Sequence, residues 1–413
     1  MKILCVVEDF PWPARGGAHL RSQQVIATLA SVGELHLFSL MYPNRPEACD
    51  LPPDVVATRL EVVTNPMPVY SFRRRLRWLT SRGLPLEVVA AENVVLRSRF
   101  QRWADGPYDL VWVSRASVFE LLGRPHLGPT IVDLVDLEDQ KIRTRLAAMR
   151  AQPIAAGIRG WTHRQVAVLQ ARWNASRWSR FQASVARSVD IVVVCSEDDL
   201  ELAGLPNAVL VPNGYEPPEV PVGRVTVDDP PVMLFQGGMH YGPNTDGAHW
   251  FVTDIAPLIR DQLPGVRIRL VGDPDGVVTR LDHRPAVTVV GSVESMEVEL
   301  ARADLVVAPL RYASGTRLKI LEALAHRIPV VSTTIGAQGL GLEPGRHLLV
   351  ADDAEGFALA CVSALTEPAL RERLVAEGHT VFLQNHQWSN ARERIRALAL
   401  KSAEPASSGP GPS

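Results

Sequence analysis

Residues 305–325, LVVAPLRYASGTRLKILEALA, specify one strand, one turn and one helix. The β-branched run Leu305–Ala308 ends at Pro309, and small residues follow. An apolar pattern at helical spacing then continues through Ala325. The stretch therefore predicts a parallel βα unit, with residues 314–316 as the turn into the helix.

Two cations fall in the first turn of this predicted helix, where the helix dipole disfavours positive charge. They are Arg317 and Lys319, and lysine occurs elsewhere only at Lys2, Lys141 and Lys401. Their position is explained if a phosphate binds the free N–H groups of the helix start. Two solvated side chains are the alternative.

Glu322 lies three residues after Lys319 and shares its helical face. A carboxylate beside a phosphate site is suited to accept hydrogen bonds from ribose hydroxyls. A solvated or ion-paired glutamate is the alternative interpretation.

The same alternation of strand and helix extends outward in both directions. Strands are predicted in the second half at Val232–Gln236, Arg267–Val271, Val287–Val290, Val330–Ser332 and Leu348–Val350, and in the first half at Ile3–Val7, Glu34–Ser39, Leu110–Val113, Thr130–Leu134 and Ile191–Cys195. We predict an α/β protein of two Rossmann-like domains. Its parts are an N-terminal domain over residues 1–215, a linker over 216–231, a C-terminal domain over 232–388, a helix over 389–401 packing back on the first domain, and a disordered tail over 402–413.

Composition agrees with two domains and narrows the class of protein. The chain has 413 residues, a net charge of −2 and 46% hydrophobic residues. Near-neutral charge argues against nucleic acid as a partner. Four separated cysteines without a Cys–X–X–Cys motif indicate reduced structural thiols, and no signal peptide or membrane-spanning stretch is recognised. We expect a cytoplasmic protein.

Two further glycine turns follow predicted strands. One contains Gly16 and Gly17 before a helix, and the other contains Gly237 and Gly238. Glycine lets a ligand approach the backbone, although the first turn is equally compatible with a plain tight turn.

The run 315–333, GTRLKILEALAHRIPVVST, followed by Gly336-Ala337-Gln338-Gly339-Leu340, resembles the donor-site signature of family 4 retaining glycosyltransferases of the GT-B fold. The resemblance extends over about residues 1–395 and favours the sub-group with a Gly-Thr-Arg-Leu-Lys turn. It implies metal-independent transfer, with retention, of a sugar from a nucleotide diphospho-sugar, which is a co-substrate and not a cofactor. It also implies two domains facing each other across a cleft.

The resemblance assigns the donor site to residues of the second half. Glu322 matches the family's ribose-binding glutamate, whereas the first glutamate of the E-x7-E motif falls at Ser314. The usual diphosphate clamp is also missing, and Arg317 with Lys319 is expected to replace it as the catalytic pair that stabilises the leaving group. The implied donor-binding residues are Gly237, Gly238, Gly291, Ser292, Ser314, Gly315, Thr316, Arg317, Leu318, Lys319 and Glu322.

On the acceptor side the resemblance implies Gly16, Gly17, His19, Asp133 and Asp136. Asp133, Asp136 and Asp139 end a predicted strand, and their spacing does not fit a calcium loop, so we predict no metal site. Acceptor recognition by Asp133 or Asp136 is favoured, and helix capping is expected for the rest.

The expected partners are a nucleotide-sugar donor and a small-molecule, glycan or lipid-linked acceptor, in cell-surface polysaccharide or secondary-metabolite biosynthesis. A catalytically silent sugar- or nucleotide-binding paralogue and a sugar-nucleotide epimerase are the alternatives. The basic stretch 72–79, FRRRLRWL, is compatible with peripheral membrane contact, but a solvated helix face is favoured. The tryptophans of the predicted helix 161–186 are expected to pack in the core. The sequence leaves the oligomeric state open.

Overall fold

The computed structural model describes the chain except residues 15, 44–48, 66–67, 82, 152–157, 224–229, 285, 314, 316 and 404–413, and the side chains of 150, 151, 158–164 and 283. The chain divides into two compact units. Unit 1 takes its described residues from Met1–Leu146, Pro153–Pro212 and Ala391–Ser413, and unit 2 from Ala147–Gln152 and Asn213–Asn390. No helix among the described residues is long and apolar enough to cross a membrane.

Unit 1 is built on a parallel sheet with the strand order β3-β2-β1-β4-β5-β6-β7. Its strands are β1 Lys2–Val7, β2 Glu34–Met41, β3 Arg59–Thr64, β4 Leu110–Ser114, β5 Thr130–Asp133, β6 Ile191–Val194 and β7 Ala208–Leu210. The central strands are apolar on both faces because helices cover both sides. β3 was not predicted, because this edge strand is mostly polar or half-exposed.

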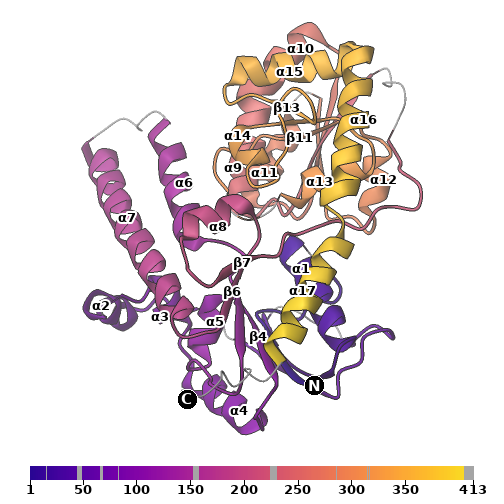
Figure 1. The fold of residues 1–413 in the computed structure, drawn as a ribbon. Helices are drawn as coiled ribbons and strands as arrows, with labels where there is room; N and C mark the ends of the chain where they lie inside the picture. Colours follow the sequence, from indigo (N-terminus) through magenta and orange to yellow (C-terminus); the bar gives the residue numbers. More distant parts are fainter. Residues whose placement is uncertain are drawn as a thin grey trace, which may run out of the picture. The chain divides into compact units, whose positions relative to one another are not determined.

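Helices cover each face of this sheet (Figure 1). They are α1 Gly17–Ala30, α2 Phe72–Thr80, α3 Leu86–Ala91, α4 Val94–Trp103, α5 Ala116–Leu121, α6 Glu138–Ala151, α7 Ile158–Ala186, α8 Glu197–Ala203 and α17 Trp388–Ala403. Side chains of α3, α4, α5 and α7 share one apolar core with the sheet. From α17, the Arg392 guanidinium donates to Gln24 of α1 at 2.8 Å.

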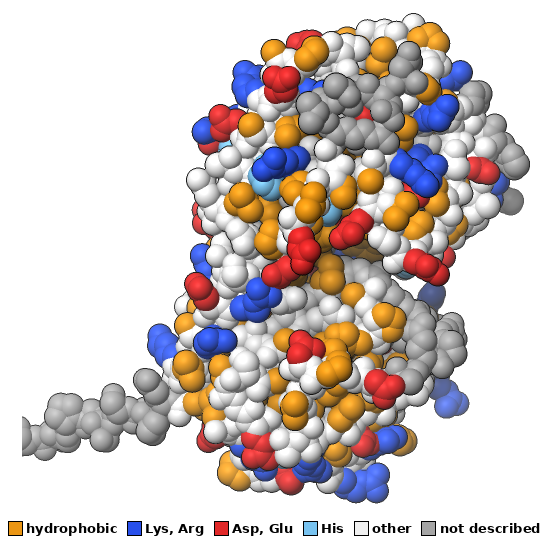
Figure 2. Space-filling view, turned by 90° about the vertical axis from the view of Figure 1, so that its right-hand side faces the viewer, with side chains coloured by type: hydrophobic (Ala, Val, Ile, Leu, Met, Phe, Trp, Pro, Cys, Tyr) orange, Lys and Arg blue, Asp and Glu red, His pale blue; other side chains and the backbone are white. Residues whose placement is uncertain are grey.

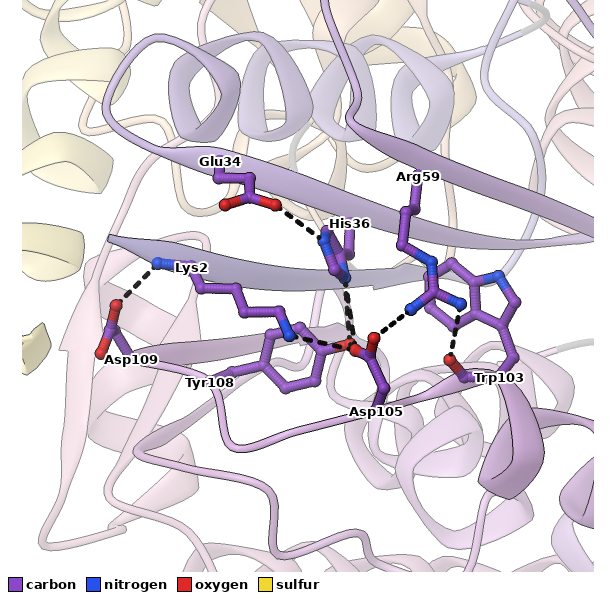
Figure 3. Close-up of polar contacts among 8 residues, drawn as sticks. All are labelled: Lys2, Glu34, His36, Arg59, Trp103, Asp105, Tyr108 and Asp109. Carbon is purple, nitrogen blue, oxygen red and sulfur yellow. Dashed lines mark hydrogen bonds and ion pairs between the residues drawn. The ribbon is translucent and has the colours of Figure 1, made fainter.

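A polar network joins the amino ends of β1, β2 and β3 to the loop before β4 (Figure 3). The Asp105 carboxylate accepts from Lys2 Nζ and from the Tyr108 hydroxyl, each at 3.1 Å, and pairs with Arg59 at 2.6 Å. The buried His36 ring lies 3.2 Å from both the Tyr108 hydroxyl and Glu34. The hydrogen bond from Lys2, with those from Tyr108 and the charge of Arg59, lowers the pKa of Asp105.

Because this pKa is lowered by folding, Asp105 stabilises the protein above its unfolded pKa of about 4, and that stabilisation is lost as the pH falls through the folded value. Asp105→Asn is expected to unfold at lower urea concentration than the wild type at pH 7, and the difference is expected to shrink as the pH approaches about 3. Urea unfolding over this pH range measures the effect, with the exposed Asp54→Asn as control. A difference independent of pH would contradict the assignment.

Unit 2 is built on a second parallel sheet, with the order β10-β9-β8-β11-β12-β13. The strands are β8 Val232–Gln236, β9 Arg267–Val271, β10 Val287–Gly291, β11 Leu305–Ala308, β12 Val330–Ser332 and β13 Leu349–Val350. The helices are α9 Gly242–Trp250, the π-helix η1 Phe251–Ile255, α10 Ala256–Gln262, α11 Gly276–Thr279, the 3₁₀-helix η2 Arg280–His283, α12 Met296–Leu300, α13 Leu318–Ala325, α14 Thr334–Ala337, α15 Ala354–Thr366 and α16 Pro368–Asn385.

Two apolar cores lie on opposite faces of this second sheet. One is formed with α9, η1, α10 and α15, and the other with α12, α13 and α16 (Figure 1). The strand order changes direction between β8 and β11, which are neighbours. Ligands of open α/β sheets bind outside the carboxyl ends of the strands at such a switch point. A ligand site is therefore expected at the loops that follow β8 and β11.

The predicted linker and tail lie partly outside the described residues. No helix or strand occurs in the described part of 216–231, and the Gly223 N–H donates to the His326 carbonyl at 2.8 Å. The predicted tail begins too early, because α17 continues through Ala403. The four cysteines are free, and three of them are buried.

Candidate functional site

Lys319 lies at the start of α13 and points across the carboxyl end of β8. Its Nζ donates to Asn244 Oδ1 at 2.7 Å and lies 4.3 Å from the centre of the Phe235 ring. Arg317 is the residue immediately before α13, and its buried guanidinium donates to the carbonyls of Gly315 and Gln338. The predicted cations are therefore both at the helix start, and Lys319 is aimed at the loop after β8.

Two glycine loops pack against each other beside Lys319. A Cβ at Gly237, where φ is +138°, would lie 3.2 Å from Lys319 Nζ. A Cβ at Gly272, after β9, would lie 1.9 Å from the Gly237 carbonyl oxygen. Only glycine at position 272 allows this approach of the two backbones. The bare backbone at Gly237 leaves room for the lysine ammonium group.

Glu322 lies one turn further along α13, where its carboxylate is held by two donors from other elements. The Tyr215 hydroxyl donates to Oε1 at 3.2 Å, and Gln236 Nε2 donates to Oε2. Burial raises the pKa of Glu322 to about 7, against the opposing effects of these hydrogen bonds and of Lys319. The carboxylate is thus fixed in orientation at the end of β8.

Sequence reasoning did not single out Tyr215, Gln236 and Asn244 as site residues. Each follows or ends a predicted feature: Tyr215 comes after the Pro-Asn-Gly turn, Gln236 ends β8, and Asn244 lies in the first turn of α9. The strand end at Gln236 was available as a signal, but the contacts of the three residues with α13 were not.

Lys319 and Glu322 have pKa values displaced toward each other. Burial lowers the pKa of Lys319 to about 7, the charge of Arg317 lowers it further, and Glu322 opposes the shift. A diphosphate bound there would add negative charge beside Lys319 and so favour its protonated form. The site is therefore sensitive to pH near neutrality.

We expect the affinity for a nucleoside diphosphate to fall at least about tenfold between pH 7 and pH 9, because binding must then take up a proton at Lys319. The affinity is also expected to fall as the pH is lowered below 7, because Glu322 then takes up a proton and loses its charge. Isothermal titration calorimetry with a nucleoside diphosphate across this range measures both parts of the pH profile. Lys319→Met should lose the alkaline part, and an unchanged profile in this variant would contradict the prediction.

The structure places Gly238 and Gly291, two of the other predicted donor residues, at the same sheet edge. The Gly238 carbonyl accepts from Asn244 Nδ2 at 2.9 Å, and the Gly291 carbonyl accepts from the Gly272 N–H at 2.8 Å. Ser292 is exposed and Leu318 is partly buried against the core of α13. Gly315 is buried, while Ser314 and Thr316 lie outside the described residues.

In unit 1, the turn before α1 lies after β1. Gly16 has extended backbone, and a Cβ there would meet no atom within 4 Å. Gly17 begins α1, and in the first turn of this helix His19 Nε2 lies 3.0 Å from Asp9 Oδ2. The predicted residues Gly16, Gly17 and His19 are thus together at the carboxyl end of β1.

The structure does not support acceptor recognition by Asp133. Its carboxylate is only 2% exposed and receives two hydrogen bonds from Arg21, at 2.7 and 3.1 Å. Arg21 also donates to the Val211 carbonyl at 3.0 Å. Both carboxylate oxygens serve this buried pair, so Asp133 joins α1 to β5 as a structural residue.

Asp136 lies in a cluster around Arg115, at the carboxyl ends of β1, β4 and β5. The guanidinium group pairs with Glu8, and lies 3.4 Å from Glu138 and 3.9 Å from Asp136. Asp139 instead lies 3.6 Å from Arg143. The three aspartates of the sequence motif therefore have different partners, and among the described residues no three His, Cys, Asp or Glu side chains form a group suited to a metal ion.

The segment that contains Lys319 and Glu322 is similar in sequence to known glycosyltransferases. Residues 230–367 match the family model of the group 1 glycosyl transferases. The chain is 30% identical over 171 residues to the lipopolysaccharide core biosynthesis glycosyltransferase LpsE of Rhizobium meliloti, covering 39% of this chain and 48% of LpsE. Matches to curated relatives span about a third to a half of the relatives' own length.

Solved structures match nearly the whole chain. Sucrose-phosphate synthase from Thermosynechococcus elongatus aligns with a TM-score of 0.67 at 17% identity, over 97% of this chain and 99% of that one. Anabaena HepE, in complex with UDP and glucose, aligns with a TM-score of 0.59 at 17% identity, over 97% and 100% of the two chains. The chain has the GT-B fold, as the resemblance implied. The predicted sub-group stays a prediction.

Proposed function

We propose that this protein is a glycosyltransferase that moves a sugar from a nucleotide diphospho-sugar to an acceptor hydroxyl group. The observation that carries the proposal is the convergence of Lys319, Glu322 and Gly237 at the end of β8, inside the segment that matches the group 1 glycosyl transferases. A cation, bare backbone and an oriented carboxylate are the groups that a nucleoside diphosphate requires.

Each group has a distinct part in donor binding. The ammonium group of Lys319 and the start of α13, next to Arg317, take the diphosphate. The Glu322 carboxylate, fixed by Tyr215 and Gln236, accepts from the ribose hydroxyls with its remaining lone pairs. UDP bound to HepE supports uridine as the first nucleotide to test.

The reaction follows from where charge develops. As the bond between the anomeric carbon and the diphosphate oxygen breaks, negative charge grows on the leaving group beside Lys319 and Arg317. The acceptor oxygen forms the new bond to the anomeric carbon, and its proton passes to the departing phosphate. We propose retention at this carbon and no requirement for a metal ion, in line with the family that the sequence resembles.

The acceptor is proposed to bind unit 1 near Gly16, Gly17, His19 and Asp136. The named role of LpsE supports a place in the biosynthesis of lipopolysaccharide or a related cell-surface polysaccharide. The similarity of this chain to a protein of 44.6 kDa in the cps region of Klebsiella pneumoniae, at 25% identity over 135 residues, supports the same proposal.

A donor screen tests the proposal. The full chain is incubated with UDP-glucose, UDP-galactose, UDP-N-acetylglucosamine and GDP-mannose, with and without lipopolysaccharide-core acceptors, and release of nucleoside diphosphate is measured. The expected result is acceptor-stimulated release with one donor, insensitive to EDTA, and a product whose anomeric configuration by NMR equals that of the donor.

Other outcomes separate the alternatives. Binding of a donor without turnover would indicate a silent paralogue, which the missing glutamate at Ser314 would explain. Release of an epimerised sugar would indicate an epimerase. If no nucleotide sugar binds, the donor-site assignment is wrong.

A further inference from the structure

Helix α2 of unit 1 exposes an apolar stripe. Phe72, Leu76 and Leu79 are 80%, 51% and 53% exposed, and their spacing places them on one helical face. The only fully buried side chain of the helix is Trp78. A surface helix ordinarily turns its apolar face to the core. In α2 the apolar face is instead exposed to solvent.

The way α2 is anchored explains the outward direction of the stripe. The Trp78 ring lies 4.6 Å from Trp173 of α7, and the Arg177 guanidinium lies over both rings. Arg74 donates to the carbonyls of Ala90 and Glu92. Trp78 and Arg74 are on the side of the helix opposite Leu76, which leaves the stripe facing solvent.

Further exposed apolar side chains lie before α2 and on α7. Val69 and Tyr70, just before α2, are 53% and 49% exposed. On α7, Val166, Leu169 and Trp173 are 54%, 62% and 38% exposed at helical spacing. Trp173 and Trp178 of α7 were both expected to be core residues. Trp178 is buried, whereas Trp173 is partly exposed. The exposed apolar side chains of α2 lie together on one face and are not scattered singly, which indicates an interaction site.

Charge on α2 itself is positive: its arginines are Arg73, Arg74, Arg75 and Arg77, and Arg77 is paired with Glu92. Arg73 and Arg75 are exposed on the two flanks of the stripe, and no Asp or Glu occurs between Glu61 and Glu87. Residues 140–189, which include α7, also contain no Asp or Glu. Elsewhere the surface is mixed: Figure 2 shows basic and acidic side chains interspersed over another face. The basic character is thus local, in a chain of net charge −2.

We propose that α2 docks on an anionic lipid surface, with Phe72, Leu76 and Leu79 inserted at the level of the head groups and Arg73 and Arg75 bound to lipid phosphates. An apolar stripe flanked by arginines fits the interface plane of a bilayer, where aromatic and aliphatic groups enter and cations stay at the phosphates. A second copy of the chain fits poorly, because a symmetric contact would bring the arginines of two α2 helices together. The sequence alone favoured a solvated helix face; exposure of the stripe changes that interpretation.

Vesicle co-sedimentation tests the proposal and requires no sugar donor, so its result is independent of the proposed function. The full chain is mixed with phosphatidylcholine vesicles with or without phosphatidylglycerol. We expect at least about tenfold tighter binding to the anionic vesicles, weakening strongly between about 0.05 M and about 0.5 M NaCl.

Matched variants locate the surface. F72S/L76S and R73E/R75E are each expected to weaken binding to anionic vesicles at least about tenfold. The controls are L359S, an equally exposed leucine on α15, and R280E/R284E in unit 2, which should bind as the wild type does. Circular dichroism checks that every variant is folded, as expected for exposed positions.

Three results would overturn the proposal. They are no binding of the wild type at low salt, equal binding to neutral and anionic vesicles, and equal losses in the α2 variants and the controls. Analytical ultracentrifugation adds a fourth test. A dimer of the wild type that dissociates in F72S/L76S, while vesicle binding is unchanged, would assign this surface to a protein contact instead.

Discussion

Glu322→Ala is expected to lower kcat/KM for the nucleotide-sugar donor by about 10- to 100-fold, equivalent to about 1.4–2.7 kcal/mol. The carboxylate is oriented by Tyr215 and Gln236, so its loss removes the proposed acceptor for the ribose hydroxyls and leaves both donors without their partner. Lys319→Ala is expected to have an effect of similar size, because it removes the ammonium group that is proposed to bind the diphosphate. Steady-state kinetics with the donor found by the screen measure both variants.

The two variants are expected to differ in the constant that changes. Loss of ribose binding by Glu322→Ala should appear mainly in KM, whereas loss of leaving-group stabilisation by Lys319→Ala should also lower kcat. Glu355→Ala, an exposed glutamate on α15, is the control. Wild-type kinetics in both site variants would refute the assignment of the donor site.

Asp133→Ala is expected to lower the free energy of unfolding by about 3–5 kcal/mol, because it leaves the buried Arg21 guanidinium without its carboxylate. The pair is 2% exposed on each side, so water does not replace the lost partner. Urea unfolding followed by tryptophan fluorescence measures the change.

The double variant R21M/D133L separates the pair from its surroundings. Replacing both charges by apolar groups should restore much of the stability lost in Asp133→Ala. A single-variant loss under about 1 kcal/mol would show that the pair is not a structural link between α1 and β5. Asp136→Ala, in the half-buried cluster around Arg115, is expected to have a smaller effect on stability.

Much of the fold was predictable from local pattern. The strands β8, β9, β11 and β12 have the predicted bounds, because short β-branched runs end at glycine, proline or polar turn residues. The edge strand β3 was missed because its residues are only partly buried, and periodicity reports burial.

The candidate donor site was predictable only in part. Lys319 and Glu322 were recognised because a rare lysine and a carboxylate lie at fixed spacing on one helix. Their partners Asn244, Gln236 and Tyr215 are 75–107 residues away in the sequence, so no local pattern relates them.

The stretch 305–325 by itself determined a strand, a turn and a helix with two cations at its start, because these features depend on residue spacing within a few turns of chain. The tertiary structure decided what the charges do. Arg21 lies 112 residues from Asp133 in the sequence, and their burial together makes a predicted acceptor residue a structural one. Likewise, the apolar stripe of α2 faces solvent because Trp78, on the opposite side of the helix, packs against Trp173. Local spacing fixes which side chains share a face, and long-range packing fixes which way that face points.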